Sequence, residues 1–256
     1  MNYPLGIIGV GDFCIYLVEG IMKRYPDMQI LLSPRGRRQS ERIHTQFGHR
    51  IANDNAEVAG QSDMILLATR PAQVEEALVG IRFRSSQTVI SVAAGVSVVK
   101  LQDLVSPANV VLCMPTNSAM IGVSPVPMFP DDSQARPILE SFGPVYVLPD
   151  EQQFNCCSVL GAYYGWVLAL QAESGEWLQQ QGISESTARG LISSMFRATA
   201  SIDQHRTDVS TRALSDELRL PGGLTEHGLN FFDDSGAIRF WSDVMQSVLE
   251  RLSKPY

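Results

Sequence analysis

Apolar and polar positions alternate in two different ways along this chain, and the change falls near Asp150. Before it, short apolar runs of strand length alternate with segments of helical period. The runs expected as strands are Leu5–Val10, Met28–Ser33, Met64–Ala68, Thr88–Val92, Asn109–Met114 and Val145–Leu148. The segments expected as helices include Asp12–Lys23, Gly36–Phe47 and Ser133–Phe142, and the proline-rich Val123–Pro130 is expected to be irregular. Strands that alternate with helices predict an α/β fold with a doubly wound parallel sheet.

Beyond Asp150 the pattern is helical throughout. Glu151–Gln181 is long, apolar-rich and free of proline, and Ser184–Ile202 follows it with Ser184 as the expected N-cap. The remaining expected helices are Thr211–Leu218, Thr225–Phe232 and Ala237–Leu252. We therefore predict two domains, residues 1–150 and residues 151–256.

Composition narrows the class of protein. A hydrophobic content of 45% and a charged content of 18% are ordinary for a globular protein, and the net charge of −7 argues against a nucleic-acid partner. The four cysteines show no metal-ligand spacing, so no metal is expected. No signal peptide is recognised, and the apolar run Val159–Leu170 is too short to span a bilayer. We expect a cytoplasmic protein that binds no membrane.

The first strand is followed by a glycine pattern, "GIIGVGDFC", that suits a dinucleotide. Gly9 would make the tight turn, and Gly11 would let a pyrophosphate approach the N-terminus of the next helix. The third glycine of the usual pattern is replaced by Cys14. The alternative is a glycine turn without a ligand, but the strand before it and the helix after it favour nucleotide binding.

The end of the second strand indicates which nucleotide is bound. An NAD site usually has an acidic residue there to hold the ribose 2′-hydroxyl, whereas this chain reads "LLSPRGRR". The hydroxyl of Ser33 and the guanidinium of Arg35 suit a 2′-phosphate, so NADP(H) is favoured. Arg37 and Arg38 either assist or form a solvated helix face.

The stretch "RLPGGLTEHGLNFFDD" raises a second candidate site. Gly222 and Gly223 allow a sharp turn, and a turn that opens a helix leaves backbone N–H groups free to bind an anion such as a carboxylate. The alternative is a tight turn between helices, with Thr225 as a helix cap.

Several stretches, in order along nearly the whole chain, together resemble the pyrroline-5-carboxylate reductase family. They are "LGIIGVGDF", "SPRGR", "NDNAEVAGQSDMILLATRP", "ISVAAGVSV" and "PGGLTEHGLNFFD". The last of these is the most specific, because it fits the second half of the family's signature.

This resemblance implies an N-terminal Rossmann domain and a C-terminal all-helical domain, similar to that of 6-phosphogluconate dehydrogenase, which dimerises by interleaving. It implies that NADPH gives a hydride to the carbon of a cyclic imine, yielding proline from pyrroline-5-carboxylate. By position, Gly222 and Gly223 inherit binding of the substrate carboxylate, and the Thr225 hydroxyl inherits contact with the ring nitrogen. The predicted cofactor contacts are Gly9, Gly11, Asp12, Phe13, Ser33, Arg35, Asn55, Ala68, Arg70, Pro71, Ala94 and Gly95.

The sequence departs from the family on the substrate side. Leu220 stands where the family has a hydroxyl residue before Pro-Gly-Gly, and "MPTNS" replaces Met-Pro-Asn-Thr-Pro. The start of the long helix reads "LGAYYGW" where the family keeps small residues, which makes Tyr163 a candidate substrate contact or proton donor; the alternative is aromatic packing at a dimer interface.

Three functions stay open at this point. The first is an NADPH-dependent reductase of pyrroline-5-carboxylate or a related cyclic imine, and the second is a non-catalytic NADP-binding dimer that acts as a sensor or partner protein. The third is a reductase of another imine or carbonyl substrate. One member of this third class, a hydroxyacid-dehydrogenase-like enzyme, normally needs a lysine on the first long helix of its C-terminal domain. No lysine lies between Lys100 and Lys254, which argues against that kind of enzyme.

Overall fold

The structure is a computed structural model that describes residues 3–252, and it consists of two compact units. Of the described residues, the first unit comprises 3–161 together with 249–252, and the second comprises Ala162–Val248. In the described part of the chain, no helix has the length and hydrophobicity needed to cross a membrane.

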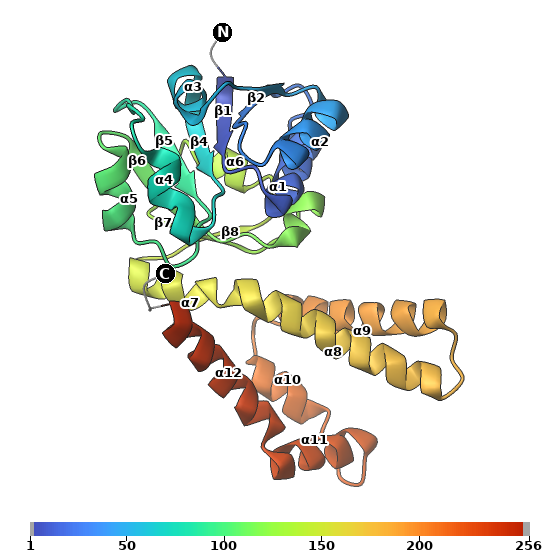
Figure 1. The fold of residues 1–256 in the computed structure, drawn as a ribbon. Helices are drawn as coiled ribbons and strands as arrows, with labels where there is room; N and C mark the ends of the chain where they lie inside the picture. Colours follow the sequence, from blue (N-terminus) through green and yellow to red (C-terminus); the bar gives the residue numbers. More distant parts are fainter. Residues whose placement is uncertain (1–2, 253–256) are drawn as a thin grey trace. The chain divides into compact units, whose positions relative to one another are not determined.

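The first unit is built on one eight-stranded sheet (Figure 1). Its spatial order is β3 (Arg50–Ile51), β2 (Ile30–Leu32), β1 (Tyr3–Ile8), β4 (Ser62–Leu67), β5 (Thr88–Ser91), β6 (Asn109–Cys113), β7 (Val126–Phe129) and β8 (Val145–Val147). All neighbouring strands are parallel except β6 and β7. The direction of winding reverses between β1 and β4, which is the place in a doubly wound sheet where ligands bind.

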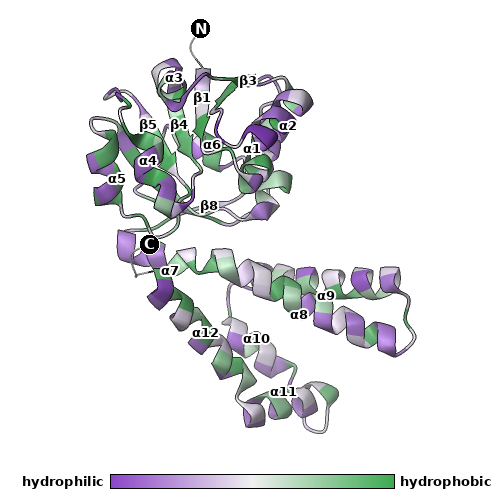
Figure 2. Ribbon diagram, viewed as in Figure 1, coloured by the Kyte–Doolittle hydropathy of each residue, from purple (hydrophilic) through white to green (hydrophobic). Residues whose placement is uncertain are grey.

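Helices cover both faces of this sheet. They are α1 (Asp12–Arg24), α2 (Arg37–Phe47), α3 (Asn55–Gln61), α4 (Val74–Leu78), α5 (Val98–Val105), α6 (Arg136–Leu139) and α7 (Glu151–Ser158), with short 3-10 turns η1 (Pro71–Gln73) and η2 (Asn117–Ile121). One apolar cluster joins α1 to one face, and a second joins α3, α4 and α5 to the other. Figure 2 shows the corresponding concentration of hydrophobic residues in the central strands. The doubly wound α/β prediction is confirmed.

Three local predictions were wrong or incomplete. Val126–Phe129 is a strand although its segment is rich in proline, because an antiparallel partner on one side and β8 on the other supply its sheet contacts. The helix expected over Ser133–Phe142 shrinks to Arg136–Leu139, and the two-residue strand Arg50–Ile51 was not expected. Strands this short carry too few positions for a periodic pattern.

The helical half of the chain contains α8 (Leu160–Gln180), α9 (Glu185–His205), α10 (Thr211–Glu217), α11 (Leu224–Ser235) and α12 (Ala237–Leu252). The expected helix Glu151–Gln181 is divided at Val159 into α7 and α8. The Ser184 cap is confirmed, since its side chain accepts a hydrogen bond from the Thr187 N–H. Thr225 is not a cap: the N-cap of α11 is Gly223, and Thr225 lies inside the first turn.

The second unit exposes an unusual amount of apolar side chain. Trp177, Met195, Phe231 and Phe240 are each more than half exposed, and Leu224 is 93% exposed. Figure 2 shows hydrophobic and hydrophilic residues alternating along α8, α9 and α12. Apolar surface of this extent is typical of a protein interface.

Candidate active site

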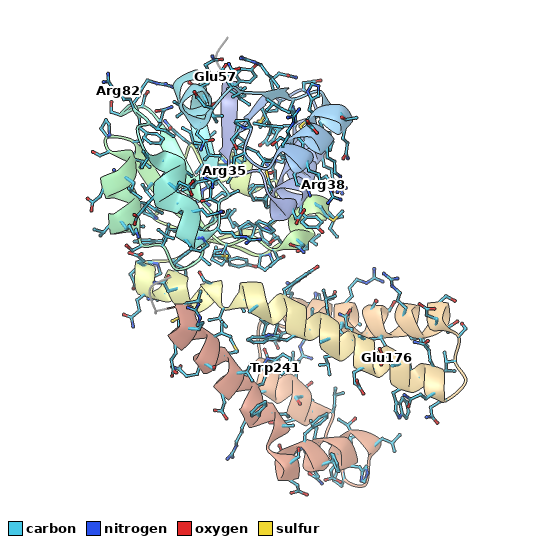
Figure 3. The ribbon with its side chains drawn as sticks, viewed as in Figure 1. Arg35, Arg38, Glu57, Arg82, Glu176 and Trp241 are labelled. Carbon is cyan, nitrogen blue, oxygen red and sulfur yellow. The ribbon has the colours of Figure 1, made fainter. Side chains whose placement is uncertain are left out.

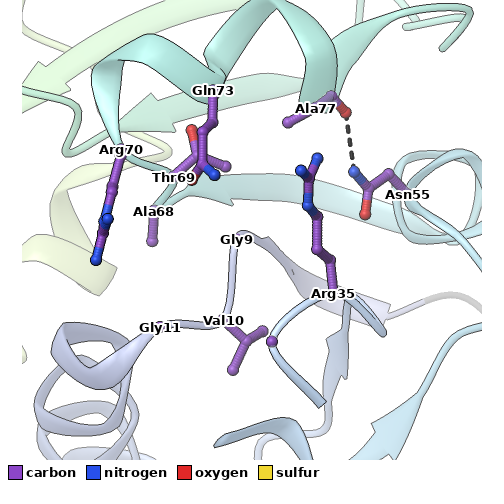
Figure 4. Close-up of a pocket in the computed structure, with 11 residues that line it drawn as sticks. Gly9, Val10, Gly11, Arg35, Asn55, Ala68, Thr69, Arg70, Gln73 and Ala77 are labelled. Atoms are coloured by element: carbon purple, nitrogen blue, oxygen red, sulfur yellow. Dashed lines mark hydrogen bonds between the residues drawn. The ribbon is translucent and has the colours of Figure 1, made fainter.

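A pocket of about 300 Å³ opens at the carboxyl ends of β1 and β4, where the winding of the sheet reverses. Figure 4 shows the residues that line it, from the turn after β1, the loop after β2, the end of β4 and helices α3 and α4. They are Gly9, Val10, Gly11, Arg35, Gly36, Asn55, Ala68, Thr69, Arg70, Gln73 and Ala77.

The two glycines of the turn after β1 have different surroundings. Gly9 has φ +92°, and a Cβ there would lie 2.5 Å from Thr69 Cγ2 and 2.6 Å from Thr69 N, so the turn packs directly against the end of β4. Gly11 is the N-cap of α1, and apart from its chain neighbours no described residue has an atom within 4 Å of the position its Cβ would take. The protein therefore leaves the space beside Gly11 open to a ligand.

The same pocket contains a polar atom without a protein partner. Thr69 Oγ1 is buried and has no hydrogen bond among the described residues. The first turn of α1, which begins at Asp12, has no side-chain cap, so it offers backbone N–H groups and the positive end of a helix dipole. An open glycine turn and a free helix N-terminus together suit the pyrophosphate of a dinucleotide.

Arg35 and Asn55 line the other side of the pocket. The Arg35 guanidinium makes two contacts with Glu76, at 2.9 Å to Oε1 and 3.1 Å to Oε2, and both side chains are more than half exposed. Asn55 Nδ2 donates a hydrogen bond to the Ala77 carbonyl oxygen at 2.9 Å (Figure 4). In Figure 3, Arg35 lies over the middle of the first unit, while Arg38 lies on α2 away from it. Arg37 pairs with Glu41 on the exposed surface of α2, as expected of a solvated helix face.

The Pro-Gly-Gly turn lies in the second unit, directly before α11. Gly222 has φ +73°, and its N–H donates a 2.7 Å hydrogen bond to Glu226 Oε2. The Gly223 N–H donates to the Leu220 carbonyl oxygen at 2.9 Å. Thr225 and Leu220 are exposed to solvent, as is His227. Both glycine donors thus have partners within the turn, while the Thr225 hydroxyl faces solvent.

Comparison with known proteins agrees with this architecture. Residues 4–95 match the family model "NADP oxidoreductase coenzyme F420-dependent", and residues 151–254 match "Pyrroline-5-carboxylate reductase dimerisation". The pyrroline-5-carboxylate reductase of Vibrio alginolyticus is 25% identical over 266 residues, covering 96% of this chain and 95% of its own.

Solved structures show the same fold. The 1-pyrroline-5-carboxylate reductase of Streptococcus pyogenes has a TM-score of 0.87 at 22% identity and covers 97% of each chain. The Plasmodium falciparum pyrroline carboxylate reductase, solved with NADP bound, has a TM-score of 0.85 at 18% identity and covers 98% of this chain and 97% of its own.

The chain carries a pyrroline-5-carboxylate reductase dimerisation domain. It is therefore an oxidoreductase of the NADP-dependent kind, with a Rossmann-type domain and a helical dimerisation domain. Both domains match those that the resemblance implied.

One predicted cofactor contact needs correction. Ser33 is fully buried, and its Oγ accepts a 3.1 Å hydrogen bond from the Gly9 N–H. Its backbone oxygen also accepts a bond from the Ser40 hydroxyl. Ser33 therefore supports the glycine turn from inside the protein, and its hydroxyl does not face a 2′-phosphate.

The other predicted cofactor contacts divide into two groups. Four more residues of the set line the pocket besides the two glycines, namely Arg35, Asn55, Ala68 and Arg70. The rest lie outside the lining: Asp12 and Phe13 begin α1, Pro71 begins η1, and Ala94 and Gly95 follow β5. Because the end of β5 is in register with the end of β4, Ala94 and Gly95 share the edge of the sheet where the pocket opens.

Tyr163 is part of an aromatic cluster within the second unit. Its ring lies edge-on to Trp241 at 5.5 Å and to Trp166 at 6.2 Å between centroids, and the two tryptophans are 6.2 Å apart. Figure 3 labels Trp241 on α12. These contacts agree with aromatic packing, and a substrate contact for Tyr163 stays a prediction.

Sequence reasoning missed three polar side chains at these sites. Thr69 is hidden in the run "ATRP", where the pattern shows only the end of a strand. Glu76 approaches Arg35 from α4, 41 residues away, and no spacing rule connects the two. Glu226 could have been found, because an acid in the third position of a helix often reaches back to the N–H groups before the cap.

Proposed function

We propose that the protein is an NADPH-dependent reductase of a cyclic imine and that it works as a homodimer. The pocket at the reversal of the sheet carries this proposal, since it combines an open glycine turn with an arginine suited to a 2′-phosphate. The match of residues 151–254 to a reductase dimerisation domain supports the dimer, as does the exposed apolar surface of the second unit. The relatives' activity makes pyrroline-5-carboxylate the first substrate to test.

The roles of the residues follow from their chemistry. The turn Gly9–Gly11 and the first turn of α1, with Asp12 and Phe13, hold the pyrophosphate, while Arg35 holds the 2′-phosphate. Bound NADPH supplies the hydride. The protein fixes the orientation in which the imine carbon receives it, which accounts for much of the rate enhancement in such reactions.

Thr225 is the proposed contact to the imine nitrogen. A protonated imine accepts hydride more readily than a neutral one, and a hydroxyl can accept a hydrogen bond from the iminium N–H or relay a proton through water. The exposed position of Thr225 in the first turn of α11 leaves its hydroxyl available for this role. Gly222 and Gly223 are the proposed contacts to a substrate carboxylate, and Leu220 and Tyr163 are the other proposed substrate contacts.

The proposal is tested by measuring NADPH oxidation with a panel of cyclic imines and keto acids. With the best substrate, Thr225→Val should lower kcat by roughly 10- to 1000-fold at an unchanged Kd for NADPH, because it removes a transition-state hydrogen bond while keeping the side-chain shape. Thr225→Ser keeps the hydroxyl and should retain most of the activity. Full activity of Thr225→Val would assign the turn a structural role. Binding of NADPH with no imine or carbonyl reduced would favour the non-catalytic alternative.

A further inference from the structure

Glu76 lies beside the cofactor pocket and contacts one of its lining residues, and the proposed function gives it no role. Its two carboxylate oxygens face the two terminal nitrogens of Arg35: one contact is a 3.1 Å hydrogen bond and the other an ion-pair contact of 2.9 Å. Arg35 is also the group assigned to the 2′-phosphate. The nitrogens that a phosphate would bind are therefore already used by a carboxylate.

The position of Glu76 relative to the pocket supports this competition. A second cavity of about 390 Å³ is lined by Glu76 and Pro34, and it shares Asn55 and Ala77 with the cofactor pocket. Glu76 thus borders the end of the pocket where the ribose of adenosine is expected. The ion pair is open to solvent, with 52% of the Arg35 side chain and 66% of the Glu76 side chain exposed, so it can exchange with a ligand.

Glu76 acts in opposite directions on the two nicotinamide cofactors. Toward a 2′-phosphate, it is a like charge and a competitor for Arg35. Toward the 2′-hydroxyl of NADH, it is a hydrogen-bond acceptor, and it supplies from α4 the acidic group that the end of β2 lacks.

We propose that Glu76 is a specificity-determining residue: it reduces the difference in affinity by which this enzyme prefers NADPH to NADH. The proposal rests on the proposed NADPH-dependent function. It predicts that the chain keeps measurable affinity for NADH although Arg35 favours the phosphorylated cofactor.

The test uses 2′,5′-ADP and 5′-AMP, which carry the adenosine end of each cofactor with and without the 2′-phosphate. Glu76→Gln in the full-length protein should tighten 2′,5′-ADP binding by roughly three- to tenfold, the effect of one charge a few ångströms from a phosphate in screened solvent. The Kd of 5′-AMP should stay within about twofold or rise slightly. Isothermal titration calorimetry measures both dissociation constants. The ratio of the Kd for NADPH to the Kd for NADH should change by the same factor as the ratio for the two probes.

Glu75→Gln is the matched control. Glu75 is the neighbouring residue on α4, but its carboxylate contacts Lys100 Nζ at 2.5 Å. The Glu75→Gln substitution removes one negative charge from the same helix as Glu76→Gln. The ratio of the Kd for 2′,5′-ADP to the Kd for 5′-AMP should therefore change by less than about twofold.

A double-mutant cycle separates competition from a general change in charge. Arg35→Ala should weaken 2′,5′-ADP binding by roughly tenfold or more, and Glu76→Gln added to it should then have a smaller effect than in the wild type. An unchanged ratio in Glu76→Gln, with clear binding of 2′,5′-ADP by the wild type, overturns this inference alone. Failure of the wild type to bind either probe overturns the proposed function as well.

Discussion

Glu226→Gln tests whether the turn before α11 receives a substrate carboxylate. In the structure, the Glu226 carboxylate accepts the Gly222 N–H at 2.7 Å, and Gly223 N–H is used by Leu220. A substrate carboxylate that binds these donors must displace Glu226 and remain near its negative charge. The turn should therefore disfavour pyrroline-5-carboxylate relative to an imine without a carboxylate.

The size of this penalty follows from Coulomb's law. Two carboxylates about 5 Å apart repel by about 1 kcal/mol in bulk water and by about 3 kcal/mol at an effective dielectric constant of 20. The turn is largely exposed, which favours the lower half of this range. A penalty of about 1–2 kcal/mol corresponds to a factor of roughly five to thirty.

The assay compares two substrates that differ only in the carboxylate. Glu226→Gln should raise kcat/KM for pyrroline-5-carboxylate by that roughly five- to thirtyfold factor and leave 1-pyrroline within about twofold. Asp234→Asn removes one charge from the same helix, further along its length, and should change neither value by more than about twofold. An unchanged kcat/KM for pyrroline-5-carboxylate in Glu226→Gln, or an equal gain for both substrates, would contradict the predicted repulsion.

Two further predictions concern assembly and stability. Sedimentation at micromolar concentration should give a dimer, because the apolar side chains exposed on the second unit need a partner surface; a stable monomer would contradict the dimer. His49 is fully buried without a partner for either ring nitrogen among the described residues, and burial lowers its pKa to about 4. Since the unfolded chain binds this proton near pH 6.5, the free energy of unfolding should fall by about 2–3 kcal/mol between pH 7 and 4.5. Urea unfolding should show that His49→Phe loses less stability over this range than the wild type, and equal losses would argue against His49 as the cause.

The fold could be predicted from the sequence because its signals are long or repeated. Leu5–Val10 and the strands that follow it are apolar runs separated by segments of helical period. Ser184 stands directly before a helical segment, where an N-cap is expected. The proline-rich strand Val126–Phe129 could not be predicted, since it depends on neighbours that only the folded sheet provides.

The candidate sites were predictable only in part. Gly9 and Gly11 are recognisable because their spacing directly after a strand is a local property of the sequence, whereas the contact of Gly9 with Thr69 appears only in the fold. The burial of Ser33 depends on how the turn after β1 lies over the end of β2, and the pairing of Arg35 with Glu76 depends on α4. Such contacts between distant segments leave no periodic signal in the chain.

The hydrogen bond from Gly9 to Ser33 restricts how this protein can change its cofactor. Replacing the residue at the end of the second strand with an acid is the obvious route toward NADH, but here that position lies inside the protein. Ser33→Asp would bury a carboxylate under the turn that shapes the pocket, at a cost that the fold would bear before any cofactor bound. Arg35 and Glu76 lie in solvent and can vary without that cost. If Arg35 and Glu76 set the cofactor preference as proposed, then cofactor choice and fold stability depend on different residues, and the first can evolve without loss of the second.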